Sequence, residues 1–214
     1  MEASATFQNI PPDKQARVLA QAREEFASHG FAGASMNRLA AGLGIAKGSL
    51  FKYFGSKEGL FAKVFDGAVE SFSGHLRSVR DETRGQPLRQ RLERILLAGT
   101  RFVDDHPGIL RLYLKVLAGG DMPLRARLLG RVRALSSRFL TPVVEEAKAR
   151  GELPPDLDAS LAVFTLDAVL DRFVQAQAQP FMDTGLHLSL DDPDAARAAA
   201  KKLAAMLAGG FRLG

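Results

Sequence analysis

Hydrophobic side chains recur every three to four residues along almost the whole chain, and no segment shows sustained alternation of hydrophobic and polar residues. Because a period near 3.6 is typical of an amphipathic α-helix and a period of two is typical of a strand, the pattern predicts an all-helical protein. The first helix is expected to begin at Pro11-Pro12-Asp13, to bury Val18, Ala22 and Phe26 as its inner stripe, and to end at Gly30.

Two short helices and a longer one are predicted to follow. Ser35 can cap the first of them, and Gly42 to Ile45 is a turn because two glycines so close together interrupt a helix. The next helix is expected from about Ala46 to Phe54. A fourth begins with Ser56 as its N-cap and extends to about Val79.

Longer helices separated by glycine and proline are predicted beyond residue 80. The hydrophobic stripes place five of them, at about 88–103, 109–117, 124–149, 158–178 and 193–208. The last is so rich in alanine that another helix could approach it closely. The chain is therefore expected to contain about nine helices.

The stretch from Phe31 to Lys57 is the most informative about function. Two short helices joined by a tight glycine turn form a helix-turn-helix, whose second helix can enter the major groove of DNA. At about 100° per residue, Leu50, Phe51 and Phe54 share one arc of the second helix. We expect these three to pack, and the opposite arc to be exposed, with Gly48, Ser49, Lys52 and Tyr53.

The exposed arc has the chemistry to bind nucleic acid. Gly48 and Ser49 would lie close to base edges, and Lys47 could donate to the acceptors of guanine. Three further residues, Lys52, Tyr53 and Lys57, suit phosphate oxygens, as does the free N-terminus of the fourth helix at Ser56. For Tyr53, a ring at the edge of the core remains an alternative.

Composition narrows the function classes. The 214 residues are 46% hydrophobic and contain no cysteine, which excludes a disordered chain, a disulfide scaffold and thiolate chemistry. The net charge of +5 is too small to identify a partner. From Gly33 to Lys57, however, four basic residues and no acidic residue occur, namely Arg38, Lys47, Lys52 and Lys57.

Other features favour less specific interpretations. The start, Met1 to Asn9, lacks the pattern of a secretory signal, and no hydrophobic run is long enough to cross a bilayer, so a cytoplasmic protein without a membrane partner is expected. Asp104-Asp105-His106 is interpreted as a surface helix end rather than a metal or acid–base site. The basic run from Arg125 to Arg138 flanks a hydrophobic stripe on both sides, which favours a solvated face or an acidic partner over DNA. No catalytic residues, metal ligands or cofactor are predicted.

From Ile10 to Phe65 the sequence resembles the TetR family of bacterial transcriptional regulators. The resemblance rests on FASHGFAGAS followed by NRLAAGLGIAKGSLFKYFGSKEGLF. It implies base contacts from Asn37, Lys47, Gly48 and Ser49, and phosphate-facing positions at Ser35, Phe51, Lys52, Tyr53 and Lys57. Two positions depart from the family pattern: Phe51 replaces a usual tyrosine, so its ring is expected to pack, and Ala46 replaces a usual serine or threonine N-cap.

The resemblance also implies the domain organisation. Residues 1–60 would form a three-helix DNA-binding domain, and residues 61–214 a larger helical domain that binds a small-molecule inducer and dimerises through its last two helices. Two recognition helices on a two-fold axis should meet half-sites about 34 Å apart on double-stranded operator DNA. The sequence offers candidate ligand-binding residues, although ordinary core packing, or ion pairing for the aspartate, remains open for each: Phe102, Tyr113, Phe139, Phe164, Asp167 and Phe173.

The sequence thus predicts a TetR-like regulator that is not an enzyme, a repressor released from its operator by a small, largely apolar ligand. One alternative is an α-helical enzyme or lipid-binding protein that uses the hydrophobic second domain. Another is a protein that coats nucleic acid without sequence preference.

Overall fold

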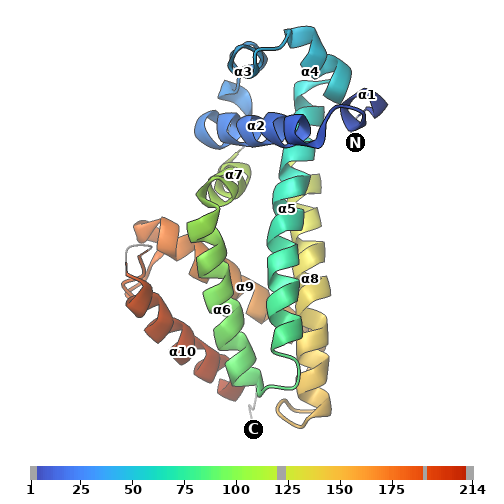
Figure 1. Ribbon diagram of the computed structural model, residues 1–214. Helices are drawn as coiled ribbons and strands as arrows, with labels where there is room; N and C mark the ends of the chain where they lie inside the picture. The colour runs from blue at the N-terminus through green and yellow to red at the C-terminus, as the bar shows by residue number, and fades with distance from the viewer. Residues whose placement is uncertain (1–3, 120–123, 190–191, 211–214) are drawn as a thin grey trace. The chain divides into compact units, whose positions relative to one another are not determined.

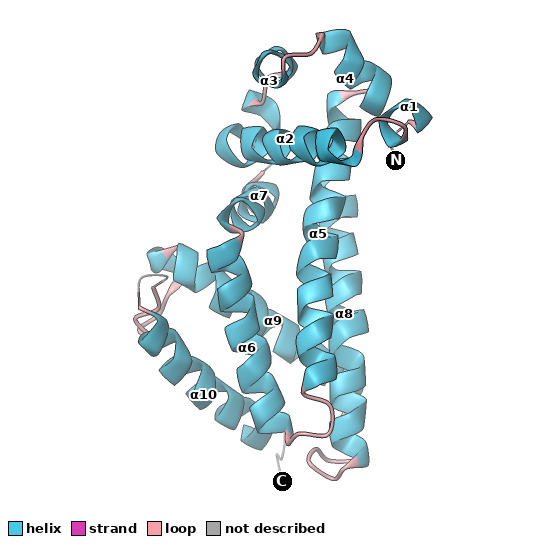
Figure 2. Ribbon diagram, in the orientation of Figure 1, coloured by secondary structure: helices cyan, strands magenta, loops and turns pink. Residues whose placement is uncertain are grey.

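The computed structural model describes residues 4–119, 124–189 and 192–210, and in these ranges all regular structure is helical (Figures 1 and 2). This confirms the predicted all-helical class. The helices are α1 (Ala5–Gln8), α2 (Pro12–Gly33), α3 (Met36–Leu43), α4 (Lys47–Phe54), α5 (Lys57–Glu82), α6 (Leu88–Asp105), α7 (Pro107–Ala118), α8 (Arg125–Ala149), α9 (Ala159–Ala178) and α10 (Pro193–Gly210), with a short 3₁₀ helix, η1 (Pro180–Met182).

Two features of the N-terminal part add detail to the sequence prediction. Gly30, where the sequence predicts the end of the first helix, has a non-helical φ of 67°, so the continuous helix does end there, and a short helical segment to Gly33 follows across this kink. A short helix, α1, lies in the N-terminal stretch, where the sequence indicated none. The predicted inner stripe of Val18, Ala22 and Phe26 is buried as expected.

The chain forms two compact units, and α5 and α8 contribute residues to both. The first comprises Met1–Ser71 and His106–Val132, and the second Phe72–Asp105 and Arg133–Gly214. These units are defined by packing, so the functional boundary between residues 60 and 61 stays a prediction.

Aromatic rings from α2 and α5 form much of the core of the first unit. Phe61 contacts Phe26 and Phe31 edge-on, with ring centroids 4.8 and 5.4 Å apart, and Phe65 lies 6.3 Å from Phe61. The same unit contains α7, which packs against α2 and forms an ion pair between Arg111 and Glu24 at 3.1 Å. This packing holds α2, against which α3 packs, and α4 in turn packs against α3 and α1.

In the second unit, α6 packs against α9 and, most extensively, against α10 (Figure 1). The buried side of α10 consists largely of alanine, at Ala196, Ala199, Ala200 and Ala204. Arg91 of α6 is buried and forms an ion pair with Glu146 of α8 at 2.8 Å. Burial alone would raise the pKa of Glu146, but hydrogen bonds from Arg91 and from the Gly85 N–H hold it below its ordinary value. No helix in the described ranges is long and hydrophobic enough to be a membrane span.

Candidate nucleic-acid interface

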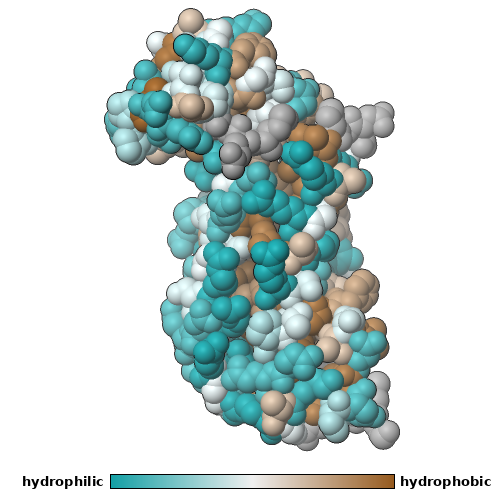
Figure 3. All heavy atoms as spheres, turned by 90° about the vertical axis from the view of Figure 1, so that its right-hand side faces the viewer, coloured by the Kyte–Doolittle hydropathy of each residue, from teal (hydrophilic) through white to brown (hydrophobic). Residues whose placement is uncertain are grey.

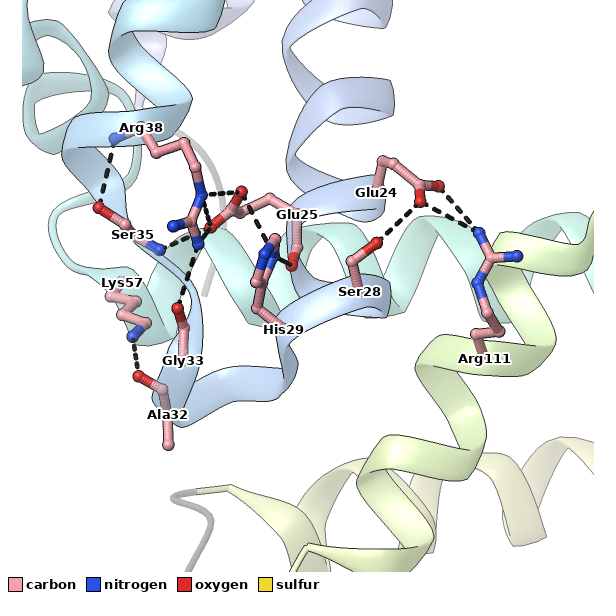
Figure 4. A network of polar contacts seen from close by, with 10 residues as sticks. All are labelled: Glu24, Glu25, Ser28, His29, Ala32, Gly33, Ser35, Arg38, Lys57 and Arg111. Carbon is pink, nitrogen blue, oxygen red and sulfur yellow. Dashed lines mark hydrogen bonds and ion pairs between the residues drawn. The ribbon is translucent and has the colours of Figure 1, made fainter.

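A polar network joins α3 to α2 (Figure 4). Ser35 is the N-cap of α3, where its Oγ accepts the Arg38 N–H at 3.2 Å, and its own N–H donates to the Glu25 carboxylate at 2.7 Å. Arg38 forms an ion pair with the same carboxylate and donates from Nε to Oε2 at 2.9 Å. Hydrogen bonds from Arg38 and then from Ser35 hold the pKa of Glu25 below its ordinary value. Glu25 therefore remains charged at neutral pH and fixes the start of α3.

This network corrects the charge count made from the sequence. Arg38 was counted among four uncompensated basic residues between Gly33 and Lys57, but Glu25 lies just outside that window and neutralises it. Three basic residues of the motif are left for a polyanion: Lys47, Lys52 and Lys57. Sequence reasoning did not single out Glu25, because its partner is one helix away.

The turn between α3 and α4 follows the predicted glycine pattern. Gly44 ends α3 with a φ of 66°, a left-handed conformation that glycine adopts without steric cost. Ala46 is the N-cap of α4 and, as expected, makes no side-chain capping bond. The backbone N–H groups in the first turn of α4 therefore receive no hydrogen bond from the side chain of the N-cap residue.

The buried side of α4 is rotated from the one predicted. Leu50 and Phe54 are buried as expected, but the third buried residue is Tyr53, at 8% exposure, whereas Phe51 is 38% exposed. The helical wheel was therefore wrong on both: Tyr53 was assigned to the exposed arc and Phe51 to the packed one. Lys47, Gly48 and Lys52 are exposed as predicted.

Helix α1 accounts for the rotation. Phe7 is only 2% exposed and packs its ring 5.5 Å from that of Tyr53 and 4.7 Å from that of Phe54. Ser4 donates from its N–H to the Tyr53 carbonyl and from its hydroxyl to the Lys52 carbonyl, each at 2.9 Å. These bonds satisfy carbonyls in the last turn of α4, where no helical N–H follows. A lone aromatic residue in a polar N-terminal stretch was the available signal for this contact.

The remaining predicted DNA-binding residues differ in exposure. Asn37 is exposed on α3, and Ser49 is half-buried on α4. A Cβ added at Gly48 would meet no atom within 4 Å, so the backbone there is open to an approaching surface. The ring of Tyr53 is buried in the core, which is the alternative that the sequence left open. The direct contacts of all these residues with DNA remain predictions.

Lys57, at the start of α5, is held in a defined position. Its Nζ donates to the Ala32 carbonyl at 3.1 Å and lies 5.0 Å from the centroid of the Phe31 ring. Ser56 caps the same helix, as predicted, by accepting the Gly59 N–H at 3.1 Å. Because an ammonium group carries three donors, Lys57 retains donors for a phosphate after the bond to Ala32.

The six candidate ligand-binding residues are divided between the two units, with Tyr113 in the first and the other five in the second. Phe139 and Phe173 belong to the core of the second unit, and Phe102 packs there against Phe72 and His75. Asp167 is held by Arg133 in an ion pair, the pairing that the sequence left open. The other two are differently placed, with Tyr113 half-buried in the first unit and Phe164 70% exposed on α9. A ligand site at these residues stays a prediction.

Two arginines of α8 form ion pairs with acidic side chains within their own units. Arg131 forms ion pairs with Asp66 at 2.8 Å and Glu70 at 3.1 Å, and Arg133 pairs with Asp167 and Asp171. Figure 3 shows the side of the molecule on which α8 lies, and hydrophilic residues cover much of it. The expected solvated helix face fits these contacts better than a second nucleic-acid surface.

The acidic end of α6 has no metal-binding arrangement. Asp104 and Asp105 are largely exposed; the partial desolvation of the Asp104 carboxyl, followed by the charge of Asp105, raises the pKa of Asp104. Within the described ranges, no three histidine, aspartate or glutamate side chains are grouped so that they could hold a metal ion.

Comparison with known proteins identifies the motif. Residues 18–64 match the profile described as bacterial regulatory proteins, tetR family. Over 148 residues the chain is 28% identical to the nucleoid occlusion factor SlmA of Sodalis glossinidius (strain morsitans), covering 65% of this chain and 72% of that protein. It is 25% identical over 175 residues to the HTH-type transcriptional regulator RutR of Escherichia coli (strain K12), covering 82% and 80%.

Solved structures extend the likeness over the whole chain. A TetR family transcriptional regulator from Chloroflexus aurantiacus J-10-FL is 27% identical, with a TM-score of 0.71 over 98% of both chains. The transcriptional regulator FadR from Bacillus subtilis, solved in complex with stearoyl-CoA, shares the fold at 15% identity, with a TM-score of 0.73 over 91% of this chain and 98% of that one.

Proposed function

Because the chain belongs to the TetR family of bacterial regulatory proteins, whose members are DNA-binding transcriptional regulators rather than enzymes, we propose that it represses transcription from an operator. In this proposal α3 and α4 bind the operator, and a small, largely apolar ligand releases the protein from it.

The outer face of α4 is the observation that carries the proposal. Lys47 and Lys52 are exposed there, and Gly48 between them leaves the backbone uncovered. No acidic residue occurs in the sequence from Gly33 to Lys57, and the nearby Glu25 is already paired with Arg38. A helix with an exposed, basic and sterically open face is suited to the major groove, which is about 12 Å wide.

A homodimer through the last two helices is part of the proposal. Large hydrophobic side chains are exposed on both helices, with Leu161 and Phe164 on α9 and Met206 on α10. Exposed hydrophobic groups of this size favour burial against a partner surface. A second copy is the partner that suits operator binding, because a two-fold axis presents two α4 helices to two half-sites. This assigns Phe164 to the dimer contact rather than to the ligand site.

The ligand is proposed to bind in the second unit. Its core is hydrophobic, and Phe102, Phe139 and Phe173 lie within that unit. FadR from Bacillus subtilis, which shares this fold, was solved in complex with stearoyl-CoA, and this supports a ligand with a large apolar part here. Helix α5, which follows α4 directly in the chain, contributes residues to both units, so a change in the second unit can reach α4 along α5. A coupling of about 1 to 3 kcal/mol would change operator affinity about 5- to 150-fold.

The test is binding of the purified protein to the DNA upstream of its own gene, compared with a scrambled duplex at one fixed salt concentration. Preference for the upstream DNA, reduced by stearoyl-CoA or another apolar compound but not by coenzyme A alone, supports the proposal. Equal affinity for both duplexes refutes it and favours the nonspecific alternative. Turnover of an apolar compound by a protein that forms no complex with DNA favours the alternative of an α-helical enzyme.

A further inference from the structure

The recognition helix α4 carries an exposed aromatic ring whose role the fold does not explain. Phe51 is 38% exposed, although its neighbours Leu50, Tyr53 and Phe54 are all buried. Its phenyl group has no donor or acceptor, so it cannot hydrogen-bond a phosphate oxygen. An apolar ring on the outer face of a binding helix strengthens binding when it is buried against an apolar group of the partner.

The surroundings of Phe51 place the ring within the proposed DNA-facing surface. Lys47 lies one turn earlier on the same side of α4, with its Nζ 5.8 Å from the ring centroid. Gly48, three residues before Phe51, has no side chain that could hold the ring away from an approaching surface, and the space around it is open. The ring therefore sits beside a cation that a polyanion attracts and beside a backbone that it can approach closely.

DNA offers one apolar group on the base edges of its major groove, the C5-methyl group of thymine. Phenylalanine is among the side chains that contact this methyl group, and lysine is among those that donate to guanine. A helix that presents Lys47 and Phe51 side by side can thus read a polar and an apolar feature of the same groove. Phosphates and sugars are common to every base pair and would give the ring no sequence information.

We propose that Phe51 is a specificity-determining residue that contacts the C5-methyl group of a thymine in each operator half-site. The inference rests on the proposed function, because it requires α4 to enter the major groove. Burying one methyl group corresponds to about a fourfold gain in affinity, so the contact contributes about fourfold per half-site and about 15-fold for a dimer on two half-sites.

The experiment first selects a binding site from random duplexes with the wild-type protein, then replaces each thymine in turn by deoxyuridine. Uracil keeps the base pairing and lacks only the methyl group. At one thymine per half-site we expect the wild type to lose about fourfold in affinity. The Phe51→Ala variant should bind the thymine and uracil duplexes equally. Lys52→Ala, a change at another exposed residue of α4, should weaken binding but keep the wild-type sensitivity to uracil.

Three results would overturn the inference while leaving the proposed function intact. The first is a wild-type protein that tolerates uracil at every thymine. The second is a Phe51→Ala variant that keeps the wild-type loss. The third is a Phe51→Tyr variant that gains affinity equally on both duplexes, because this would place the ring at the phosphate backbone. If no sequence is enriched in the selection, the proposed function itself fails, which distinguishes the two outcomes.

Discussion

Replacing Lys57 by alanine removes a cation that the fold holds in place. The Nζ of Lys57 is fixed by the Ala32 carbonyl at 3.1 Å and by the Phe31 ring at 5.0 Å. Little side-chain freedom is therefore lost when it binds a phosphate, and the contact carries no base information. We expect Lys57→Ala to weaken binding to every DNA sequence by a similar factor.

The expected size follows from counterion release. Each neutralised phosphate contributes about 0.9 to the slope of log affinity against log salt concentration, so the loss of one contact per subunit reduces the slope of a dimer by about 1.8. Between about 50 and about 200 mM salt, a fourfold change, the ratio of wild-type to variant affinity should fall about 12-fold. The internal hydrogen bond of Lys57 contributes about 1 kcal/mol to folding, so the variant should remain folded.

Fluorescence anisotropy titrations over this salt range measure both slopes. Lys201→Ala is the matched control, because Lys201 is an exposed lysine on α10 in the other unit, and its slope should equal that of the wild type. A Lys57→Ala slope equal to that of the wild type, in a protein with an unchanged melting temperature, would show that Lys57 only supports the fold. A loss confined to one DNA sequence would instead make it a base contact.

Four further predictions concern other parts of the chain. Ser49→Ala should change the preferred base at one position per half-site while leaving affinity for scrambled DNA unchanged, as measured by competition binding. Phe7→Ala should destabilise the fold by about 3 kcal/mol in urea denaturation and weaken DNA binding, because it removes the ring that packs against Tyr53 and Phe54 of α4. Unchanged DNA binding would mean that α1 does not position α4. Glu25→Gln should lower the free energy of unfolding by about 1 to 3 kcal/mol at neutral pH. Because the pKa of Glu25 is lowered in the folded protein, its contribution to stability is present above the ordinary pKa of 4.5 and is lost as the pH falls through the lowered pKa. The free energies of unfolding of the wild type and the Glu25→Gln variant should therefore converge in acid. A difference that stays constant with pH would contradict this. Phe164→Glu should give a monomer in sedimentation velocity, and an unchanged dimer would remove α9 from the interface.

The features that the sequence predicted correctly depend on neighbours within one or two helical turns. The Ser35 and Ser56 caps and the left-handed Gly44 each follow from a single residue type at a helix end. Helix periods likewise repeat locally, which is why the helices of the motif and those beyond residue 80 were predicted close to their observed bounds. A resemblance over one contiguous segment supplied the family for the same reason.

The features that it missed depend on contacts between distant segments. On the helical wheel of α4, the polar residues were assigned to the exposed side, which predicted an exposed Tyr53 and a buried Phe51. The true division is set by Phe7, which reaches α4 from the start of the chain. The charge of Arg38 is likewise cancelled by Glu25 from α2. Neither partner can be identified from periodicity, because the pattern shows that a side is buried and not which element buries it.

The candidate ligand residues show the same limit more strongly. Aromatic side chains at helical spacing are required for packing whether or not a ligand binds, so spacing alone could not separate the two roles. Phe139 and Phe173 lie in one core, while Tyr113 belongs to the other unit and Phe164 is exposed. The candidate DNA-binding residues rest on a more specific signal, because a groove-binding helix requires small and basic residues where a purely structural helix does not; their contacts with DNA stay predictions.

The central claim is that α4 binds DNA in a sequence-specific manner, and selection from a pool of random duplexes tests it most directly. The purified protein should enrich a palindromic site with two half-sites whose centres lie about 10 base pairs, or a multiple of this, apart. A Lys47→Ala variant selected in parallel should enrich sites that differ at the position of a guanine. Enrichment of no sequence, with binding that depends only on salt concentration, would contradict the account.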